Sequence, residues 1–213
     1  MNFEISNNMI IKYIGSDSSF IIPNTYNVDG IETDILMLKD SIFKCCRKIE
    51  NIVISEGIQI IEKEAFSNCG NLITITIPES IKIIGKRAFY GCSNLNMITI
   101  PKNVEIIEER TFSFCHKLKV VNFAENSRLF KISSSAFRCC DNLEEIILPK
   151  TLESIESNAF SYCEKLLKIV IPPSVTLIKE DVFLESNKVT LYVTKGTYAE
   201  EYAKKYNLKH VLQ

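Results

Sequence analysis

The chain has 213 residues, of which 25 are lysine or arginine and 26 are aspartate or glutamate, so its formal net charge is −1 at pH 7. This balance argues against the basic footprint of proteins that bind nucleic acid or anionic membranes, and no apolar run approaches the ~20 residues that cross a bilayer. We therefore expect no nucleic-acid partner and no membrane insertion. A chain of this length buries about 70% of its unfolded surface and needs no covalent staple.

Residues 1–41 are predicted to form an N-terminal cap that includes a degenerate first repeat. Residues 9–23, MIIKYIGSDSSFIIP, place two apolar runs around a polar turn at 15–19, a pattern that predicts a hairpin. Phe20 precedes Phe43 by 23 residues, which is the interval of the repeats that follow. The region around Phe20 is therefore interpreted as an imperfect repeat.

Residues 42–195 are built from one block that recurs at a fixed interval. The block AFSNCGNL at 65–72 returns, with changes, at 42–49, 88–95, 111–118, 136–143, 159–166 and 182–189. Its phenylalanines lie 23 residues apart, except for one step of 25. They are Phe43, Phe66, Phe89, Phe112, Phe137, Phe160 and Phe183.

Each block is followed by a run that resembles a β-strand, such as LITITIP at 72–78, and then by a shorter apolar pair, such as Ile81 and Ile84. The pattern Leu-x-x-Ile-x-Ile is the strand signature of leucine-rich repeats, whose period is about 20–29 residues. One such unit cannot bury its apolar side chains alone, so the units are expected to stack with strands about 4.8 Å apart. The sequence thus predicts a leucine-rich repeat solenoid with a parallel β-sheet face and short helical or irregular turns.

Six of the eight cysteines occupy one position of the repeat. They are Cys46, Cys69, Cys92, Cys115, Cys140 and Cys163, and Ser186 takes the place in the last repeat. A catalytic thiol is normally single and has a base nearby, whereas the only histidines are His116 and His210. The cysteine column is therefore interpreted as small buried filler, each thiol donating a weak hydrogen bond to the backbone.

Disulfides and metal binding are disfavoured by the same arrangement. Stacked repeats hold equivalent Cβ atoms farther apart than the ~3.8 Å of a disulfide, so reduced thiols are expected. The adjacent pairs Cys45–Cys46 and Cys139–Cys140 lack the ligand spacing of a zinc site. Cys45 and Cys139 lie outside the column and are the better candidates for reactive thiols. No metal and no cofactor is expected.

Residues 196–213 are predicted to form a C-terminal capping helix and tail. Thr197 and Glu200 have the spacing of a capping box. Tyr198, Tyr202 and Tyr206 recur at helical spacing and form one stripe. The stripe is expected to close the last repeat, because the strand near 189–193 would otherwise be an open edge; a binding face is the alternative.

The repeats resemble those of BspA-like leucine-rich repeat proteins. The resemblance rests on the recurring AFxxCxxL block, on the connection Ile-Pro-x-x-Val/Ile-x-x-Ile at 100–107 and 171–178, and on KGTYAEEYAKKY near the C-terminus. It covers roughly residues 20–206, and departs most at 122–132, where the proline is missing and two residues are added. It implies a right-handed solenoid without enzymatic activity, of a kind found among surface proteins, some of them implicated in adhesion to host proteins.

The leading functional hypothesis is a protein-binding solenoid that acts through the outward side of its parallel strands. Residues beside the inward isoleucines should face out, and several of them are apolar, as at a partner site. The candidate partner-binding residues are Met97, Val120, Asn122, Glu145, Ile147, Lys168 and Val170. The alternative is that β-branched residues merely suit an exposed strand.

Three further points stay open at this level. A self-assembling scaffold that uses the sheet edges is the second functional hypothesis, and an enzyme that uses a cysteine thiol is the third; a filled solenoid should have no deep pocket. The start MNFEISNNMIIKY lacks the features of a secretion signal and favours the cytoplasm, whereas the resemblance favours a surface or secreted protein with a host or extracellular partner. The sequence does not set the oligomeric state.

Overall fold

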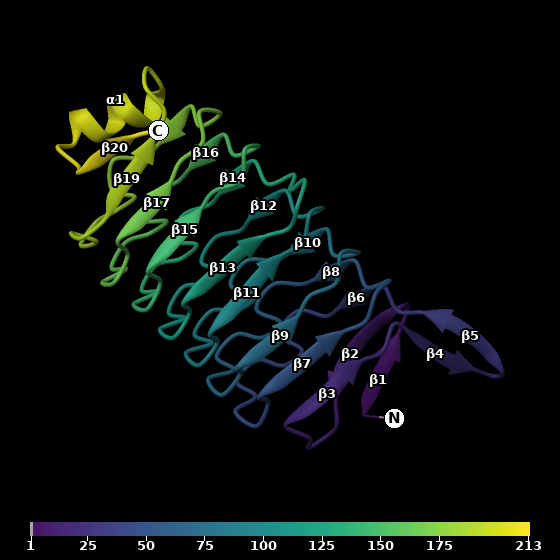
Figure 1. Ribbon diagram of the computed structural model, residues 1–213. Coiled ribbons are helices and arrows are strands. Elements are labelled where there is room, and N and C mark those ends of the chain that lie inside the picture. Colours follow the sequence, from purple (N-terminus) through teal and green to yellow (C-terminus); the bar gives the residue numbers. More distant parts are fainter. Residues whose placement is uncertain (1) are drawn as a thin grey trace.

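The computed structural model describes residues 2–213, and each repeat in it contributes a longer and a shorter strand to opposite faces of a solenoid (Figure 1). The long-strand face consists of β3 (Ser19–Ile22), β7 (Asn51–Ile54), β9 (Thr74–Thr76), β11 (Met97–Ile100), β13 (Val120–Phe123), β15 (Glu145–Ile147), β17 (Lys168–Val170) and β19 (Thr190–Val193). The short-strand face consists of β6 (Met37–Leu38), β8 (Ile60–Ile61), β10 (Ile83–Ile84), β12 (Ile106–Ile107), β14 (Lys131–Ile132), β16 (Ser154–Ile155) and β18 (Leu177–Ile178).

Neighbouring repeats pair in parallel and keep the register of the repeat. Met97 lies opposite Val120 on the long-strand face, and Lys168 lies opposite Glu145. The long-strand face is divided into three paired groups, in the orders β3-β7-β9, β11-β13 and β15-β17-β19-β20, where β20 is His210–Leu212. The predicted fold class, a leucine-rich repeat solenoid with a parallel sheet face, is confirmed.

The core is made of columns of equivalent residues. The middle residue of each long strand points inward and is buried, as Ile98, Ile146 and Ile169 show. The phenylalanines form a continuous column in which Phe89 and Phe112 stack with ring centroids 5.4 Å apart and planes 2° from parallel. This column holds the blocks together because every inner ring has an aromatic neighbour on both sides.

The turns that carry the phenylalanines are stabilised by a third hydrogen-bond ladder between repeats. The amide of Phe112 donates to the carbonyl oxygen of Ala136 at 2.8 Å, and that of Phe66 donates to Ala88 at 2.8 Å. This ladder requires left-handed residues on either side of each phenylalanine, such as Arg110 at φ 56° and Phe114 at φ 62°. Such a conformation costs a non-glycine residue about 1–2 kcal/mol, which the additional inter-repeat hydrogen bonds offset.

The predicted hairpin over residues 9–23 is wrong. β2 (Met9–Tyr13) pairs antiparallel with β1 (Phe3–Ser6), whereas β3 pairs parallel with β7. The turn between β1 and β2 is formed by Asn7 at φ 49° and Asn8 at φ 61°, and two positive φ angles are what a tight hairpin turn needs. The hairpin cap therefore lies nearer the N-terminus than predicted.

Phe20 belongs to the first, degenerate repeat, but it does not extend the phenylalanine column. It lies in β3 opposite Ile52, in the position of an inward strand residue. Its ring packs on Tyr13, 4.7 Å away between centroids, and on Phe43 at 5.9 Å. The interval of 23 residues therefore matched a phenylalanine to the wrong position of the repeat.

A second hairpin, β4 (Thr25–Val28) and β5 (Ile31–Asp34), projects from the N-terminal end of the solenoid (Figure 1). Its turn contains Asp29 at φ 51° and Gly30 at φ 85°. Asp-Gly is a strong sequence signal for a two-residue hairpin turn.

The C-terminal cap is a helix, as predicted, but not with the predicted cap contacts. α1 (Tyr198–Lys205) begins after Thr197, whose hydroxyl donates to the carbonyl oxygen of Thr194 and makes no capping bond to the helix. Glu200 accepts from the amide of Gly196 at 2.6 Å instead of from Thr197. The reciprocal capping box is therefore absent, because the Glu200 carboxylate binds the amide of Gly196, one residue before Thr197.

The three tyrosines of the stripe differ in burial, and Tyr202 is the one that caps the core. Tyr202 is buried, packs against Phe183 at 6.4 Å between ring centroids and donates its hydroxyl to the carbonyl oxygen of Lys179. Tyr198 is exposed and Tyr206 is half-buried. Tyr202 thus closes the phenylalanine column, while β20 pairs with the strand that was expected to be an open edge.

Candidate protein-binding face

The outward residues of the long strands form two columns on one face of the solenoid. In β11, β13 and β15 the exposed and buried positions alternate, so Met97, Val120 and Ile147 point outward with 50%, 38% and 59% of their surface exposed. The alternation predicted from the sequence is confirmed for these strands. Three large apolar side chains therefore reach solvent on neighbouring strands in the middle of the face.

The character of this face changes along the solenoid. Toward the N-terminus Thr74, Asn51 and Ser19 form a hydrogen-bonded polar ladder, with 2.7 Å between Thr74 Oγ1 and Asn51 Oδ1 and 3.0 Å between Asn51 Nδ2 and Ser19 Oγ. Toward the C-terminus Lys168 pairs with Glu145 at 2.6 Å and lies over the ring of Tyr192. The apolar segment lies between these two polar segments.

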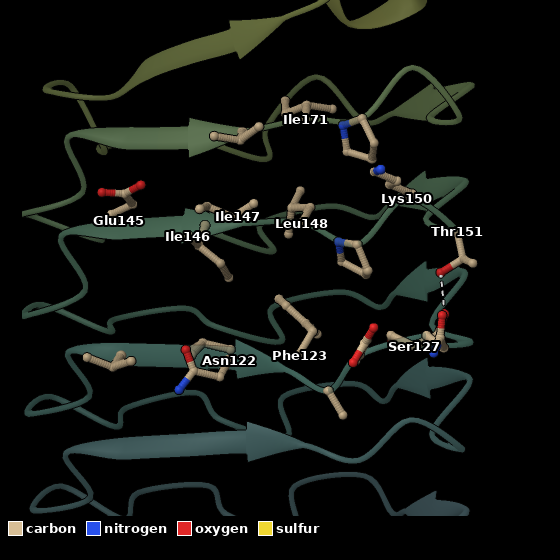
Figure 2. Close-up of a pocket in the computed structure, with 18 of the residues that line it drawn as sticks. Asn122, Phe123, Ser127, Glu145, Ile146, Ile147, Leu148, Lys150, Thr151 and Ile171 are labelled. Carbon is tan, nitrogen blue, oxygen red and sulfur yellow. Dashed lines mark hydrogen bonds between the residues drawn. The ribbon is translucent and has the colours of Figure 1, made fainter.

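An open groove of about 1020 Å³ lies on this face between β13 and β15 (Figure 2). Figure 2 shows Asn122 and Phe123 on one strand, Glu145 and Ile147 on the next, and Leu148 just after that strand. The groove continues beyond the strand ends to Pro149, Lys150 and the loop at 124–127. Its floor is largely apolar, and its rim carries Glu125, Glu144 and Lys119 as well as Lys150.

The groove coincides with the one irregular step of the repeat. The two additional residues of the 25-residue step lie in the region 122–132. β13 and β15 are not paired with each other in the sheet, a break that also occurs between β9 and β11. Thr151 fixes the longer loop by hydrogen bonds of 3.1 Å to the carbonyl oxygen of Ser127, drawn in Figure 2, and of 2.7 Å to that of Leu129. The surface of the solenoid is thus hollowed at this step, by a groove that is open to solvent.

Most of the predicted site residues meet at the groove. Its lining includes Val120, Asn122, Glu145, Ile147 and Val170. The other two lie beside it, because Met97 is the strand partner of Val120 and Lys168 is the strand partner of Glu145. Lys168 and Val170 are half-buried and thus offer less surface than predicted.

Sequence reasoning missed the part of the groove that lies beyond the strands. Phe123, Pro149 and Lys150 line it, as do Thr194 and Gln213 from the C-terminal part of the chain. The signal that could have located it is the 25-residue step itself, because an insertion in a solenoid must bulge from one face.

The cysteine column is a structural element. The thiol of Cys115 is buried and donates to the carbonyl oxygen of Phe89, with 3.2 Å between Sγ and oxygen. Four other cysteines make the same bond to the phenylalanine one repeat before them: Cys69, Cys92, Cys140 and Cys163. Ser186 uses its hydroxyl for the same purpose, 2.6 Å from the carbonyl oxygen of Phe160. Cys46, the first member of the column, is half-buried and not buried as predicted, and all eight cysteines are free thiols.

These thiols do not have the properties of a nucleophile. Burial raises the pKa of Cys115 to about 12, so the reactive thiolate is scarce at neutral pH. His116 is exposed, and its Nδ1 lies 2.6 Å from Oδ2 of Asp141. The ring is thus held by Asp141 at the surface, while the Cys115 thiol is bonded to the backbone in the core.

The two cysteines outside the column differ from each other. Cys45 is exposed, and Cys139 is half-buried. Burial raises the pKa of the Cys139 thiol, an effect that the neighbouring Arg138 partly opposes. Cys45 is therefore the more accessible of the two thiols that the sequence singled out.

Within residues 2–213 no cluster of three or more histidine, cysteine, aspartate or glutamate side chains is arranged to hold a metal ion. The same residues contain no helix with the length and apolar character needed to cross a bilayer.

Comparison with protein families supports the repeat assignment. The family model described as BspA type leucine rich repeat region matches residues 36–131 and 82–209, with six copies. No curated protein sequence matches the chain.

Solved structures of bacterial leucine-rich repeat proteins share the fold. A leucine-rich repeat protein of Treponema pallidum is 16% identical, with a TM-score of 0.56 over 98% of this chain and 94% of the other. One from Eubacterium ventriosum is 19% identical, with a TM-score of 0.54 over 85% of this chain and 41% of the other. A leucine rich cell surface protein from Faecalibacterium prausnitzii is 17% identical, with a TM-score of 0.48 over 99% and 92%. At these identities the first two likenesses concern the fold alone.

Proposed function

Because the chain belongs to the BspA-type leucine-rich repeat family, whose members generally bind proteins, we propose that it binds a protein partner through its long-strand face, centred on the groove between β13 and β15. The observation that carries the proposal is the coincidence of this groove with the exposed apolar side chains of Val120 and Ile147. Large exposed apolar patches, especially those with a polar rim, mark sites of protein interaction.

The surroundings of the patch favour a contact at its centre. Val120 and Ile147 flank the groove, Met97 extends the apolar surface by one strand, and the paired charges of Glu145 and Lys168 border it. Residues at the middle of an interface contribute most of the binding free energy, because their neighbours exclude water. The alternative, that β-branched residues merely suit an exposed strand, accounts for the side chains but not for a groove beneath them.

The test is a double charge substitution, Val120→Glu with Ile147→Lys, in a protein used as bait with an extract of the cells that produce it. Both side chains are exposed, so the free energy of unfolding should change by about 0.5 kcal/mol per site or less. Proteins captured by the wild type and lost with this variant are the partners that the proposal predicts.

A matched control lies on the short-strand face. Ile83 and Leu177 are exposed there by 50% and 36%, so Ile83→Glu with Leu177→Lys introduces the same charges on the opposite face. Loss of capture with this control, together with retention of capture by the Val120→Glu, Ile147→Lys variant, would show that the partner binds the short-strand face and would contradict the proposal.

Self-assembly is a second candidate function, favoured by the charge at the two ends. Residues 2–36 carry five carboxylates and one lysine, whereas residues 194–213 carry four lysines and two glutamates. The edge strands β3 and β20 present Ile21 and Val211, both exposed. Head-to-tail association would then grow with concentration and weaken with salt, and sedimentation velocity at low and high ionic strength distinguishes this function from a monomeric binder.

A further inference from the structure

The long-strand face ends in an open strand edge at each end of the solenoid. β3 is paired with β7 alone, and β20 is paired with β19 alone, so each has one side without a partner strand. The breaks at β9–β11 and β13–β15 are different, because there the next strand of the same chain lies alongside. An open edge presents free main-chain N–H and C=O groups to another chain.

The alternation of bonding along a strand identifies the groups that are free. Ser55 donates its amide to the carbonyl oxygen of Ile22, on the side of β7. Successive residues of a strand bond to opposite neighbours, so Ile21 directs its N–H and C=O groups away from β7. Gln213 donates its amide to β19, so Leu212 directs its own groups away from β19. Among residues 2–213 neither Ile21 nor Leu212 has a main-chain partner on its open side.

The side chains at the two edges are apolar and in phase with each other. Ile21 and Val211 are 64% and 40% exposed. Leu212 lies opposite the buried Val193 and thus in an inward position, yet 48% of its surface is exposed because no further strand covers it. Pairing in the register of the repeat would bring Val211 opposite Ile21 and Leu212 opposite the inward Ile22. Neither strand contains the lysine, acidic residue or proline that protects an open edge.

Strand direction and charge both favour contact between unlike ends. β3 and β20 each run parallel to the strand beside them, so they can pair in parallel, as the repeats do within the chain. Residues 2–36 at the β3 end carry five carboxylates and one lysine, whereas residues 194–213 at the β20 end carry four lysines and two glutamates. Two β3 ends or two β20 ends repel each other, and a β3 end attracts a β20 end.

We propose that β20 of one copy pairs in parallel with β3 of a second copy, an inference that rests on the self-assembly function described above. The amide of Leu212 donates to the carbonyl oxygen of Ile21, and the amide of Ile21 donates to the carbonyl oxygen of His210. Different surfaces of the two copies take part, so every added copy leaves one β3 edge and one β20 edge free. The assembly is therefore an open chain of copies.

The experiment uses two proline variants, each of which blocks one end. Ile21→Pro removes the free amide of β3, and Leu212→Pro removes that of β20. Proline is tolerated on edge strands whose N–H faces solvent, and circular dichroism checks that both variants fold. Ile21→Lys adds a positive charge at the same exposed position without the proline ring, and decides the question if Ile21→Pro unfolds. Ile83→Lys, on the short-strand face, is the matched control.

Sedimentation velocity at low ionic strength measures the association. We expect the wild type and Ile83→Lys to form larger species as concentration rises, and Ile21→Pro, Leu212→Pro and Ile21→Lys alone to associate at least about tenfold more weakly. An equimolar mixture of the two proline variants should form a 1:1 complex and nothing larger. In that mixture the Ile21→Pro copy supplies an intact β20, and the Leu212→Pro copy supplies an intact β3.

Two outcomes would overturn this inference alone. Dimers of either proline variant by itself would show that two like edges pair. Wild-type assembly that none of the three end variants weakens would show that another surface is used. A wild type that stays monomeric at every concentration at low ionic strength would remove the self-assembly function together with the inference, and would leave the proposed binding face untouched.

Discussion

Replacement of Phe112 by alanine tests whether the phenylalanine column holds the solenoid together. Phe112 is fully buried, and its ring stacks between those of Phe89 and Phe137, with centroids 5.4 Å away on both sides. The substitution removes the ring from the middle of the column without touching either face. It thus isolates the contribution of the column from that of partner binding.

The structure sets the expected magnitude near the upper end of the usual range. Emptying a buried aromatic site costs about 3–5 kcal/mol, and the cost is highest where the surroundings cannot collapse. Here the backbone on both sides is fixed by the third ladder, since Phe89 donates to Thr111 and Phe112 donates to Ala136. We therefore expect a loss of about 4–5 kcal/mol in the free energy of unfolding.

Urea unfolding followed by circular dichroism measures this loss, since the chain has no tryptophan. Phe183→Ala is a graded control, because Phe183 is 7% exposed and has a phenylalanine neighbour on one side only, 6.1 Å away; about 2–3 kcal/mol is expected there. Phe114→Ala, at a half-buried position, should cost less than either. A loss below about 1 kcal/mol for Phe112→Ala would show that the column does not carry the stability assigned to it.

Three further predictions concern the thiols and the C-terminal cap. Under native conditions the five buried column thiols should react with a thiol reagent only on the timescale of unfolding, and fast reaction of six or more of the eight cysteines would contradict a buried column. The pKa of Cys115 is raised to about 12 from an ordinary value of 9.0, so the protonated thiol contributes its full stability below pH 9 and loses it as the pH rises toward 12. Cys115→Ser should therefore reduce the fall in the free energy of unfolding between these pH values by about 1.4 kcal/mol per pH unit, measured by urea unfolding. The same dependence of the unfolding free energy on pH in the variant and the wild type would refute this. Tyr202→Phe removes the hydroxyl bond to Lys179 and should cost about 0.5–1.5 kcal/mol, whereas Tyr198→Phe, at an exposed position, should change thermal stability little; equal effects of the two would contradict the capping role of Tyr202.

The columns were predictable from the sequence because a solenoid repeats one local environment in every turn. Once Cys69 and Cys115 occupy the same position of the repeat, their burial follows from stacking, and strand alternation places Val120 and Ile147 outward. The repeat period of 23 residues, with its Leu-x-x-Ile-x-Ile strand pattern, also indicated a leucine-rich repeat protein. These inferences depend on periodicity alone, and the structure preserves that periodicity in the full repeats except at the 25-residue step.

The inferences that failed concern places where periodicity does not apply. Phe20 matched the interval of the column, yet the chain enters the first repeat along β3 and places this ring on a strand. Thr197 and Glu200 have the spacing of a capping box, but the preceding turn offers the amide of Gly196 to the carboxylate first. The groove lies at the two additional residues, and the path of their loop depends on the hydrogen bond from Thr151 to Ser127. A sequence pattern does not predict that contact.

Hydrogen exchange of the complex with the captured partner tests the binding face most directly. The account predicts slower amide exchange on binding at 118–125 and 144–150, which border the groove, and unchanged exchange at 81–86 and 175–179 on the short-strand face. Protection confined to the short-strand face or to the solenoid ends, with the groove amides unaffected, would contradict it.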